Sequence, residues 1–198
     1  MNNKKAFIFI GPSGSGKGTQ VELLKEYLKE KDPSREILHY DAGKSLREYV
    51  TTDKYMAGLV NETMISEGGL LPIFITIWNW SRVFANDMKD NMNLIMDGSP
   101  RKHEEKKLVD DALQYLGYRD IYVIYLKVNI GVSVKRLTLR GRVDDTEENI
   151  YNRIRWFIKD VSNTVDDFAI DQRYKFLEIE GDQTIEEVHK EIISKLEF

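Results

Sequence analysis

Short apolar runs alternate with longer amphipathic stretches along this 198-residue chain. The first run covers residues 6–10 and is followed by a glycine-rich turn and an amphipathic stretch at 19–30, which predicts a strand, a loop and a helix. Further apolar runs predict strands at 37–40, 93–96, 121–128 and 175–179. Because strands that alternate with helices form parallel sheets covered on both faces, the pattern predicts an α/β fold with a doubly wound parallel sheet.

Helical spacing of apolar residues predicts helices at 44–51, 54–67, 72–90 and 184–196, and a charged helix between the third and fourth strands. Ile73, Ile77, Trp80 and Phe84 recur at this spacing and are predicted to pack in the core. The charged run at 101–107 is interpreted as the solvated start of a helix. In such a fold, ligands bind beyond the carboxyl ends of the strands.

Length and composition narrow the classes of protein that fit. A chain of 198 residues predicts a single domain, 1–198. The 29 Lys and Arg against 33 Asp and Glu give a net charge of -4 with no basic tail, so long nucleic acids are not expected partners. The absence of a membrane-length apolar run and of a cleavable hydrophobic segment at Met1–Lys5 predicts a soluble, cytoplasmic protein. Zero cysteines exclude disulfides and thiolate chemistry.

The strongest chemical signal is the pattern Gly11-x-x-x-x-Gly16-Lys17-Gly18-Thr19 between the first predicted strand and helix. Glycines allow backbone N–H groups to turn around phosphate oxygens, the helix N-terminus attracts negative charge, and Lys17 reaches the outer phosphates. The hydroxyl that commonly follows the lysine comes one residue later here, at Thr19. The pattern predicts that ATP contacts Gly11, Ser13, Gly14, Ser15, Gly16, Lys17, Gly18 and Thr19.

The string Gly-Lys-Gly-Thr-Gln at 16–20 resembles the adenylate kinase family of P-loop nucleoside monophosphate kinases. The resemblance continues in Ala42-Gly43-Lys44-Ser45-Leu46-Arg47, where Arg47 would hold the monophosphate. It implies a monophosphate-binding insertion at 41–72, with Leu70 and Leu71 flanking the acceptor base.

The segment Asp97-Gly98-Ser99-Pro100-Arg101 resembles the Asp-Gly-Phe-Pro-Arg signature of the same family. The resemblance places Asp97 near a hydrated Mg²⁺ ion, and Gly98 and Arg101 at the monophosphate. The glutamine that recognises adenine in the family corresponds to Glu105, and an ionised carboxylate can only accept hydrogen bonds. Ala42 also occurs in pyrimidine monophosphate kinases, so UMP or CMP is the alternative to AMP, and GMP stays open.

The stretch 136–145 resembles the family's lid and its hinges, with Arg153 eleven residues after Arg142. The resemblance implies that Arg136 stacks on the donor adenine, beside Gly181. Phosphate charge would be neutralised by Arg140, Arg142 and Arg153, while Asp144 and Asp145 would lie at a hinge or near metal-bound water. Only Gly141 separates Arg140 from Arg142, whereas even short-lid members have several more residues, so the lid is expected to be vestigial. Independently, Asp144, Asp145, Glu147 and Glu148 fit the acidic first turn of a helix.

Phosphoryl transfer needs positive charge and positioning more than covalent chemistry. The predicted function is therefore Mg²⁺-dependent transfer from ATP to AMP, giving two ADP, by a monomer without a general base. Lys17, Arg101, Arg142 and Arg153 are the predicted catalytic residues, and Arg47, Arg142 and Arg153 also bind AMP. One alternative of another class is a nucleotide-binding protein without transferase activity. A small-molecule kinase is disfavoured by the two acceptor-side motifs.

Overall fold

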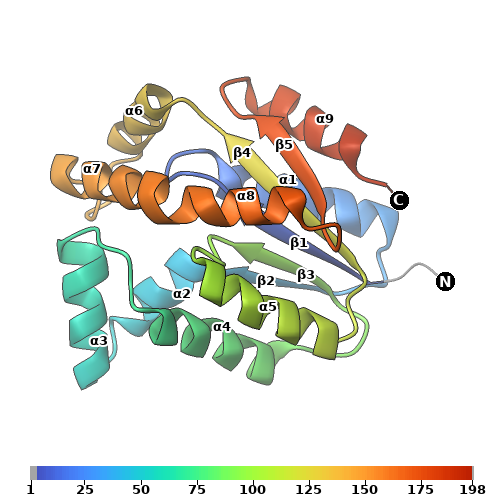
Figure 1. Ribbon diagram of the computed structural model, residues 1–198, viewed down its shortest axis with the longest axis horizontal. Coiled ribbons are helices and arrows are strands. Elements are labelled where there is room, and N and C mark those ends of the chain that lie inside the picture. The colour runs from blue at the N-terminus through green and yellow to red at the C-terminus, as the bar shows by residue number, and fades with distance from the viewer. Residues whose placement is uncertain (1–3, 198) are drawn as a thin grey trace.

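A computed structural model describes residues 4–197 as an α/β fold around one sheet (Figure 1). Its strands are β1 (Lys5–Ile10), β2 (Ile37–Asp41), β3 (Asn93–Asp97), β4 (Asp120–Lys127) and β5 (Lys175–Glu180). All strand pairs are parallel, in the order β2-β3-β1-β4-β5. The predicted fold class and all five predicted strands are thereby confirmed. Residues 1–3, on which part of the solubility prediction rests, lie outside the described range.

Helices cover both faces of the sheet. They are α1 (Lys17–Lys31), α2 (Ala42–Tyr49), α3 (Tyr55–Val60), α4 (Ile73–Asp87), α5 (His103–Tyr115), α6 (Ile130–Arg140), α7 (Glu147–Trp156), α8 (Ser162–Ile170) and α9 (Ile185–Lys195), with two π-helical segments, η1 (Asn61–Ser66) and η2 (Phe157–Val161). Among residues 4–197, no helix is both long and apolar enough to cross a membrane.

The alternation of side chains along the strands builds two hydrophobic cores. Ala6, Ile8 and Ile10 of β1 face one core, which is completed by α4, α5, η2 and α8. Phe7 and Phe9 face the other core, which is completed by α1 and α9. Residues 6–10 of β1 are therefore buried on both faces, which explains why this stretch is a continuous apolar run rather than an alternating one.

Several helix boundaries differ from the predicted ones. The predicted helix at 54–67 is α3 followed by the π-helical η1, and the predicted helix at 72–90 is the shorter α4. On α4, Trp80 and Phe84 are buried and Ile77 packs beside them, as predicted. No element was predicted for α6, and only an acidic first turn was predicted for the continuous helical run from α7 through η2 to α8.

The start of α7 resolves one ambiguity of the sequence. Thr146 caps the helix by accepting a hydrogen bond from the Asn149 amide at 3.2 Å, and Glu147 and Glu148 lie in the first turn. Only these two of the four carboxylates therefore favour the helix dipole, because Asp144 and Asp145 precede the cap.

Residues 41–72 include α2, α3 and η1, which lie at the end of the molecule farthest from the chain termini (Figure 1). Their apolar side chains form a small cluster with the start of α4, made by Leu46, Val60, Leu71 and Ile75. Leu71 is thus part of a packed core and is 4% exposed. This cluster gives the segment a fixed shape of its own beside the sheet.

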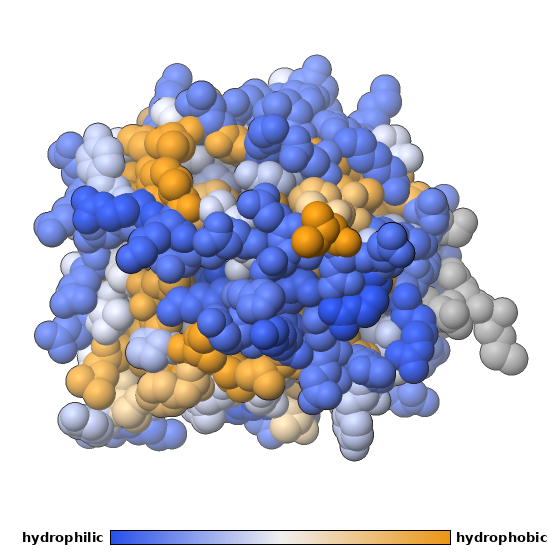
Figure 2. Space-filling model, viewed as in Figure 1, coloured by the Kyte–Doolittle hydropathy of each residue, from blue (hydrophilic) through white to orange (hydrophobic). Residues whose placement is uncertain are grey.

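The interpretation of 101–107 as a solvated helix start is wrong for Lys106, which is buried. Lys106 is only 5% exposed, and its ammonium lies 2.7 Å from Asp171 and 3.3 Å from Asp110. The same ammonium lies 4.9 Å from the ring centroids of Phe168 and Tyr174. Sequence periodicity missed this burial because Asp171, Phe168 and Tyr174 come from α8 and the turn after it. The outer face near α5 and α8 is otherwise largely hydrophilic (Figure 2).

Lys106→Met should lower the free energy of unfolding by about 2 kcal/mol at pH 7, because two half-buried carboxylates lose a cation. The loss is moderated because Arg173 still contacts both Asp110 and Asp171. Lys107→Met, at the exposed neighbouring position, is the matched control and should change the free energy of unfolding by less than about 0.5 kcal/mol. Urea unfolding measures both values, and equal effects would contradict the buried ion pairs.

Candidate functional site

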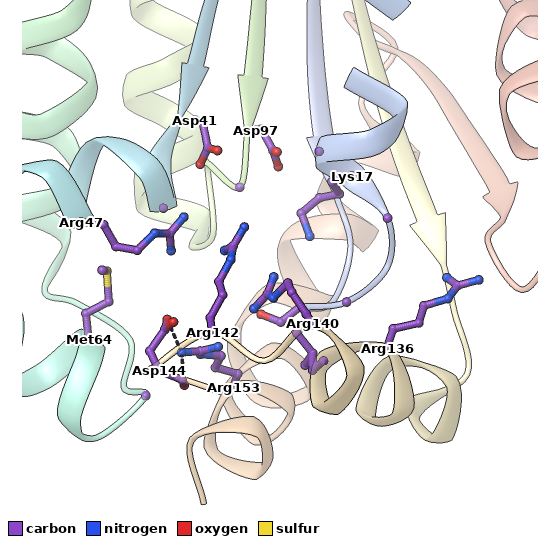
Figure 3. A pocket seen from close by; sticks show the side chains of 18 of the residues that line it. Lys17, Asp41, Arg47, Met64, Asp97, Arg136, Arg140, Arg142, Asp144 and Arg153 are labelled. Carbon is purple, nitrogen blue, oxygen red and sulfur yellow. Dashed lines mark hydrogen bonds and ion pairs between the residues drawn. The ribbon is translucent and has the colours of Figure 1, made fainter. Parts of the chain in front are cut away.

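A cavity of about 670 Å³ opens beyond the carboxyl ends of the strands (Figure 3). Its walls come from the phosphate loop, the ends of β2 and β3, the segment after η1, and the turn between α6 and α7. Predicted site residues that line it are Ser13, Gly14, Gly16, Lys17, Gly18, Thr19, Arg47, Asp97, Gly98, Arg101, Arg136, Arg140, Arg142 and Arg153. The cavity therefore joins residues from both predicted nucleotide sites.

The phosphate loop connects β1 to α1 in the predicted context. Gly16 adopts a left-handed conformation with φ of 93° as α1 begins, and no side chain among the described residues caps this helix start. The first amide groups of the helix can therefore bind an anion. Gly14 has φ of 83°, and a Cβ atom there would lie 2.7 Å from the Ser133 carbonyl oxygen, so the loop requires glycine at this position.

Lys17 lies where the loop meets the helix. Its ammonium donates hydrogen bonds to the carbonyl oxygens of Gly11 at 2.8 Å and Pro12 at 2.9 Å. Burial lowers the pKa of Lys17 to about 8, against the opposing attraction of Asp97. The cation is thus held at the cavity wall in surroundings that would favour a strongly anionic ligand.

Two carboxylates end neighbouring strands and face the same cavity. Asp97 is the last residue of β3, and Asp41, the last of β2, is its register partner. Burial raises the pKa of Asp97 to about 6; Lys17 opposes this rise and Asp41 adds to it. Asp41 also caps α2, because its side chain accepts a hydrogen bond from the Lys44 amide at 2.9 Å.

The arginines from the end of α6 to α7 fall into two groups. Arg140 and Arg153 are held by carboxylates: Arg140 makes a bidentate contact with Asp145 at 2.8 and 2.7 Å, and Arg153 contacts Asp145 and Asp144 at 2.8 and 2.6 Å. The Asp145 side chain is fully buried by these contacts. Among residues 4–197, no acceptor pairs with the guanidinium of Arg142, and burial lowers its pKa, as does repulsion from Arg140.

Arg47 and Arg101 approach the cavity from the other side. Arg47 points into it from α2, toward Arg142 (Figure 3). Arg101 donates from Nε to the Gly98 carbonyl oxygen at 2.7 Å, and burial lowers its pKa. In the described part of the chain, neither the Arg47 guanidinium nor the Nη groups of Arg101 form an ion pair, so both can contact a ligand.

Other predicted site residues do not line this cavity. Glu105 is 1% exposed, and its carboxylate accepts hydrogen bonds from the Ser99 hydroxyl and, at 2.8 Å, from the Arg101 amide. The carboxylate thus holds the turn that carries Arg101. The remaining ones away from the lining are Gly11, Ser15, Ala42, Leu70, Leu71 and Gly181.

Gly181 lies beside Arg136. Its carbonyl oxygen accepts a hydrogen bond from Arg136 at 3.0 Å, and its amide donates to the Lys127 carbonyl oxygen at 2.8 Å. A Cβ atom at Gly181 would lie 2.4 Å from the Val128 side chain. The glycine therefore lets this loop pack against the end of β4, next to a cation that lines the cavity.

Asp144, expected at a hinge or near metal-bound water, also lines the cavity. Sequence reasoning assigned no site role to several other lining residues, namely Glu22, Asp41, Gly43, Met64, Gly68, Gly69, Leu137 and Trp156. For Asp41 a signal existed, because it follows an apolar strand just as Asp97 does. For Trp156 there was none, because its place depends on how α7 packs.

The lining as a whole is electropositive although the chain is acidic. It contains seven cations against four carboxylates, namely Lys17, Arg47, Arg101, Arg136, Arg140, Arg142 and Arg153 against Glu22, Asp41, Asp97 and Asp144. Planar guanidinium groups bind phosphate oxygens bidentately. The arrangement can hold several phosphate groups between the loop on one wall and Arg47 on the other.

Residues 9–173 match the family model of adenylate kinase. An adenylate kinase 1 of Nostoc sp. is 34% identical over 190 residues, which cover 96% of this chain and 97% of that relative. An adenylate kinase of Prochlorococcus marinus is 31% identical over 179 residues, 90% and 92% of the two chains. One of Nautilia profundicola is 32% identical over 191 residues, 96% and 94% of the two chains. The similarity seen in the short motifs thus extends over almost the whole chain.

Asp97→Asn should stabilise the metal-free protein. Burial raises the pKa of Asp97 from its ordinary 3.8 to about 6, so its carboxyl ionises first in the unfolded chain and stability is lost as pH rises through this window. The variant lacks this loss. The free energy of unfolding of Asp97→Asn should therefore exceed that of the wild type by about 2 kcal/mol at pH 8, and the difference should vanish near pH 4.

Urea unfolding in EDTA between pH 4 and 8 measures this difference. Asp90→Asn, at an exposed position, is the control and should change stability little at any pH. A difference for Asp97→Asn that does not vary with pH would contradict the buried carboxylate.

Proposed function

The chain belongs to the adenylate kinase family, and on that premise we propose that it transfers the terminal phosphoryl group of MgATP to AMP, yielding two ADP. A member of this family is a nucleoside monophosphate kinase and thus a transferase. One observation carries the detailed proposal: a single cavity has the phosphate loop on one wall and Arg47 with the end of η1 on the other. This arrangement suits a donor and an acceptor held in line.

The donor side of the proposal uses the phosphate loop. The amides of the loop and of the first turn of α1 hold the ATP phosphates, with Lys17 on the outer ones. Arg136 and Gly181 flank the donor base, and their mutual hydrogen bond of 3.0 Å supports this pairing. Arg140 adds charge from the α6 terminus.

The acceptor side uses the insertion at 41–72. Arg47 binds the AMP phosphate, and Gly68 and Gly69 line the cavity beside Met64, where a base can lie. Ala42, Leu70 and Leu71 do not line the cavity, and Leu71 is packed in the small core. In this proposal they support the acceptor wall from behind. The names of the similar proteins favour AMP over UMP, CMP or GMP as acceptor.

The two strand-end carboxylates fit a magnesium ion or its water ligands. Mg²⁺ prefers oxygen ligands and retains several waters. Asp97 is 7% exposed, and no donor among the described residues hydrogen bonds to its carboxylate, which suits a group whose partner is a hydrated cation. Asp41 lies beside it and extends the oxygen surface. When bound, the ion neutralises phosphate charge.

Catalysis in this proposal is electrostatic. Lys17, Arg101 and Arg142 contact the transferring phosphoryl group and stabilise its charge, so no general base is required. Arg153 supports the same charge and binds AMP with Arg142, although Asp144 and Asp145 share its guanidinium. Glu105 contributes by holding the Arg101 turn, at 2.8 Å from the Arg101 amide.

Closure of the site involves the short turn at 136–145. Arg140 and Arg142 are separated by Gly141 alone, and Asp145 fixes Arg140, so we propose that this segment is a vestigial lid with little freedom. The proposed enzyme acts as a monomer. A cytoplasmic location follows from the proposed role in nucleotide metabolism.

A coupled assay with MgATP and, in turn, AMP, UMP, CMP or GMP tests the proposed function. AMP should be the preferred acceptor by kcat/KM. Preference for another base would preserve the mechanism and refute AMP as the substrate. Tight ATP binding with no transfer to any of the four would favour a nucleotide-binding protein without transferase activity.

Lys17→Met should reduce kcat at least about a thousandfold, because about 4 kcal/mol of transition-state stabilisation is lost with the ammonium. The variant should stay folded, since burial of that ammonium is unfavourable. Purified in parallel, it also reports contaminating kinase from the expression host. Turnover near that of the wild type would refute the role of the phosphate loop.

A further inference from the structure

Trp156 makes a long-range contact that the proposed mechanism does not yet use. It is the last residue of α7, it lines the cavity, and its indole N–H donates a hydrogen bond to the Gly68 carbonyl oxygen at 3.0 Å. Gly68 follows η1, at the end of the insertion. The indole therefore links the helix after the vestigial lid to the segment that lines the acceptor side.

The same indole supports Arg101. The guanidinium carbon of Arg101 lies 5.1 Å from the centroid of the Trp156 ring. A cation on the face of a tryptophan is attracted by the ring, and the planar guanidinium stacks on it. With Nε bonded to the Gly98 carbonyl oxygen at 2.7 Å, these two contacts orient the Nη groups, which have no paired acceptor among residues 4–197.

Two asparagines of α7 contact the same segment without touching Arg101. Asn149 donates to the Ile65 carbonyl oxygen and Asn152 to that of Glu67, each at 2.8 Å. Positions 149, 152 and 156 lie on one face of a helix. Gly68 has φ of 61°, and a Cβ atom there would lie 2.8 Å from Asn149 Cα, so the two backbones are in close contact.

We propose that Trp156 is a positioning residue that couples docking of the insertion onto α7 to the orientation of Arg101. The inference rests on the proposed function, in which Arg101 contacts the transferring phosphoryl group. When Gly68 is docked, its carbonyl fixes the indole, and the indole fixes the guanidinium plane. When Gly68 moves away, the indole N–H loses its acceptor and the ring is no longer held beneath Arg101.

Three variants separate the two contacts of the indole. Trp156→Phe keeps an aromatic ring and removes the N–H donor, Trp156→Leu removes both, and Asn152→Ala removes only the neighbouring contact to the insertion. At saturating MgATP, Asn152→Ala should raise the KM for AMP about three- to tenfold and leave kcat within about twofold. Trp156→Phe should raise the KM for AMP by a similar factor and lower kcat about three- to fivefold, because its ring is no longer held by Gly68. Trp156→Leu should, in addition, lower kcat at least about tenfold.

A double-mutant cycle shows whether Trp156 acts through Arg101. In an Arg101→Lys background, which lacks the planar group, Trp156→Leu should change kcat by less than about twofold. A kcat loss that is the same in both backgrounds would indicate general damage and overturn the proposal. Equal kcat for Trp156→Phe and Trp156→Leu would overturn it as well. Urea midpoints of all variants control for folding.

Calorimetric titration with AMP alone distinguishes this inference from the proposed function. Trp156→Leu and Arg101→Lys should weaken AMP binding non-additively, whether or not transfer occurs. A wild type that binds AMP without transferring phosphate would refute the proposed function alone. Additive weakening, or no binding of AMP by the wild type, would overturn the coupling.

Discussion

The burial of opposite charges at the carboxyl ends of a parallel sheet is the constraint on which the site depends. Burial lowers the pKa of Lys17 to about 8 and raises the pKa of Asp97 to about 6, so it favours the neutral form of each side chain. Loop carbonyls hold the ammonium, and Asp97 lies beside a second carboxylate, Asp41, with no hydrogen-bond donor among the described residues. Such an arrangement costs stability in the ligand-free chain and is relieved by an anion with a bound cation, which is the chemistry of a magnesium nucleotide.

The arginines are arranged around this pair with different degrees of freedom. Asp144 and Asp145 hold Arg140 and Arg153 at the start of α7, whereas Arg47 and Arg142 face the cavity without an ion pair in the described chain. The held arginines give the short turn a fixed shape, and the unpaired ones supply charge to a ligand. Hydrogen bonds from α7 to the end of η1 and to the segment after it extend the same scaffold to the acceptor side.

Sequence patterns were sufficient for the sheet and insufficient for the helices that cross the site. The strands were predictable because both of their faces are buried, which leaves uninterrupted apolar runs such as Phe7 to Ile10. Beyond its acidic first turn, the run from α7 to α8 escaped prediction, since its character depends on packing over the sheet and on a π-helical segment. Lys106 was misjudged for a related reason: no local pattern shows that a cation will meet Asp171, sixty-five residues away.

By itself, the sequence determined the fold class, the phosphate loop and the set of arginines, because these follow from apolar runs, glycine positions and motif order. Only the tertiary structure decided how those residues are used. It placed Asp41 beside Asp97, enclosed Glu105 within the turn that carries Arg101, and set Trp156 between Arg101 and Gly68. The physical reason is that pKa shifts, ion pairing and stacking depend on distances between segments remote in the chain, and local sequence carries no information about those distances.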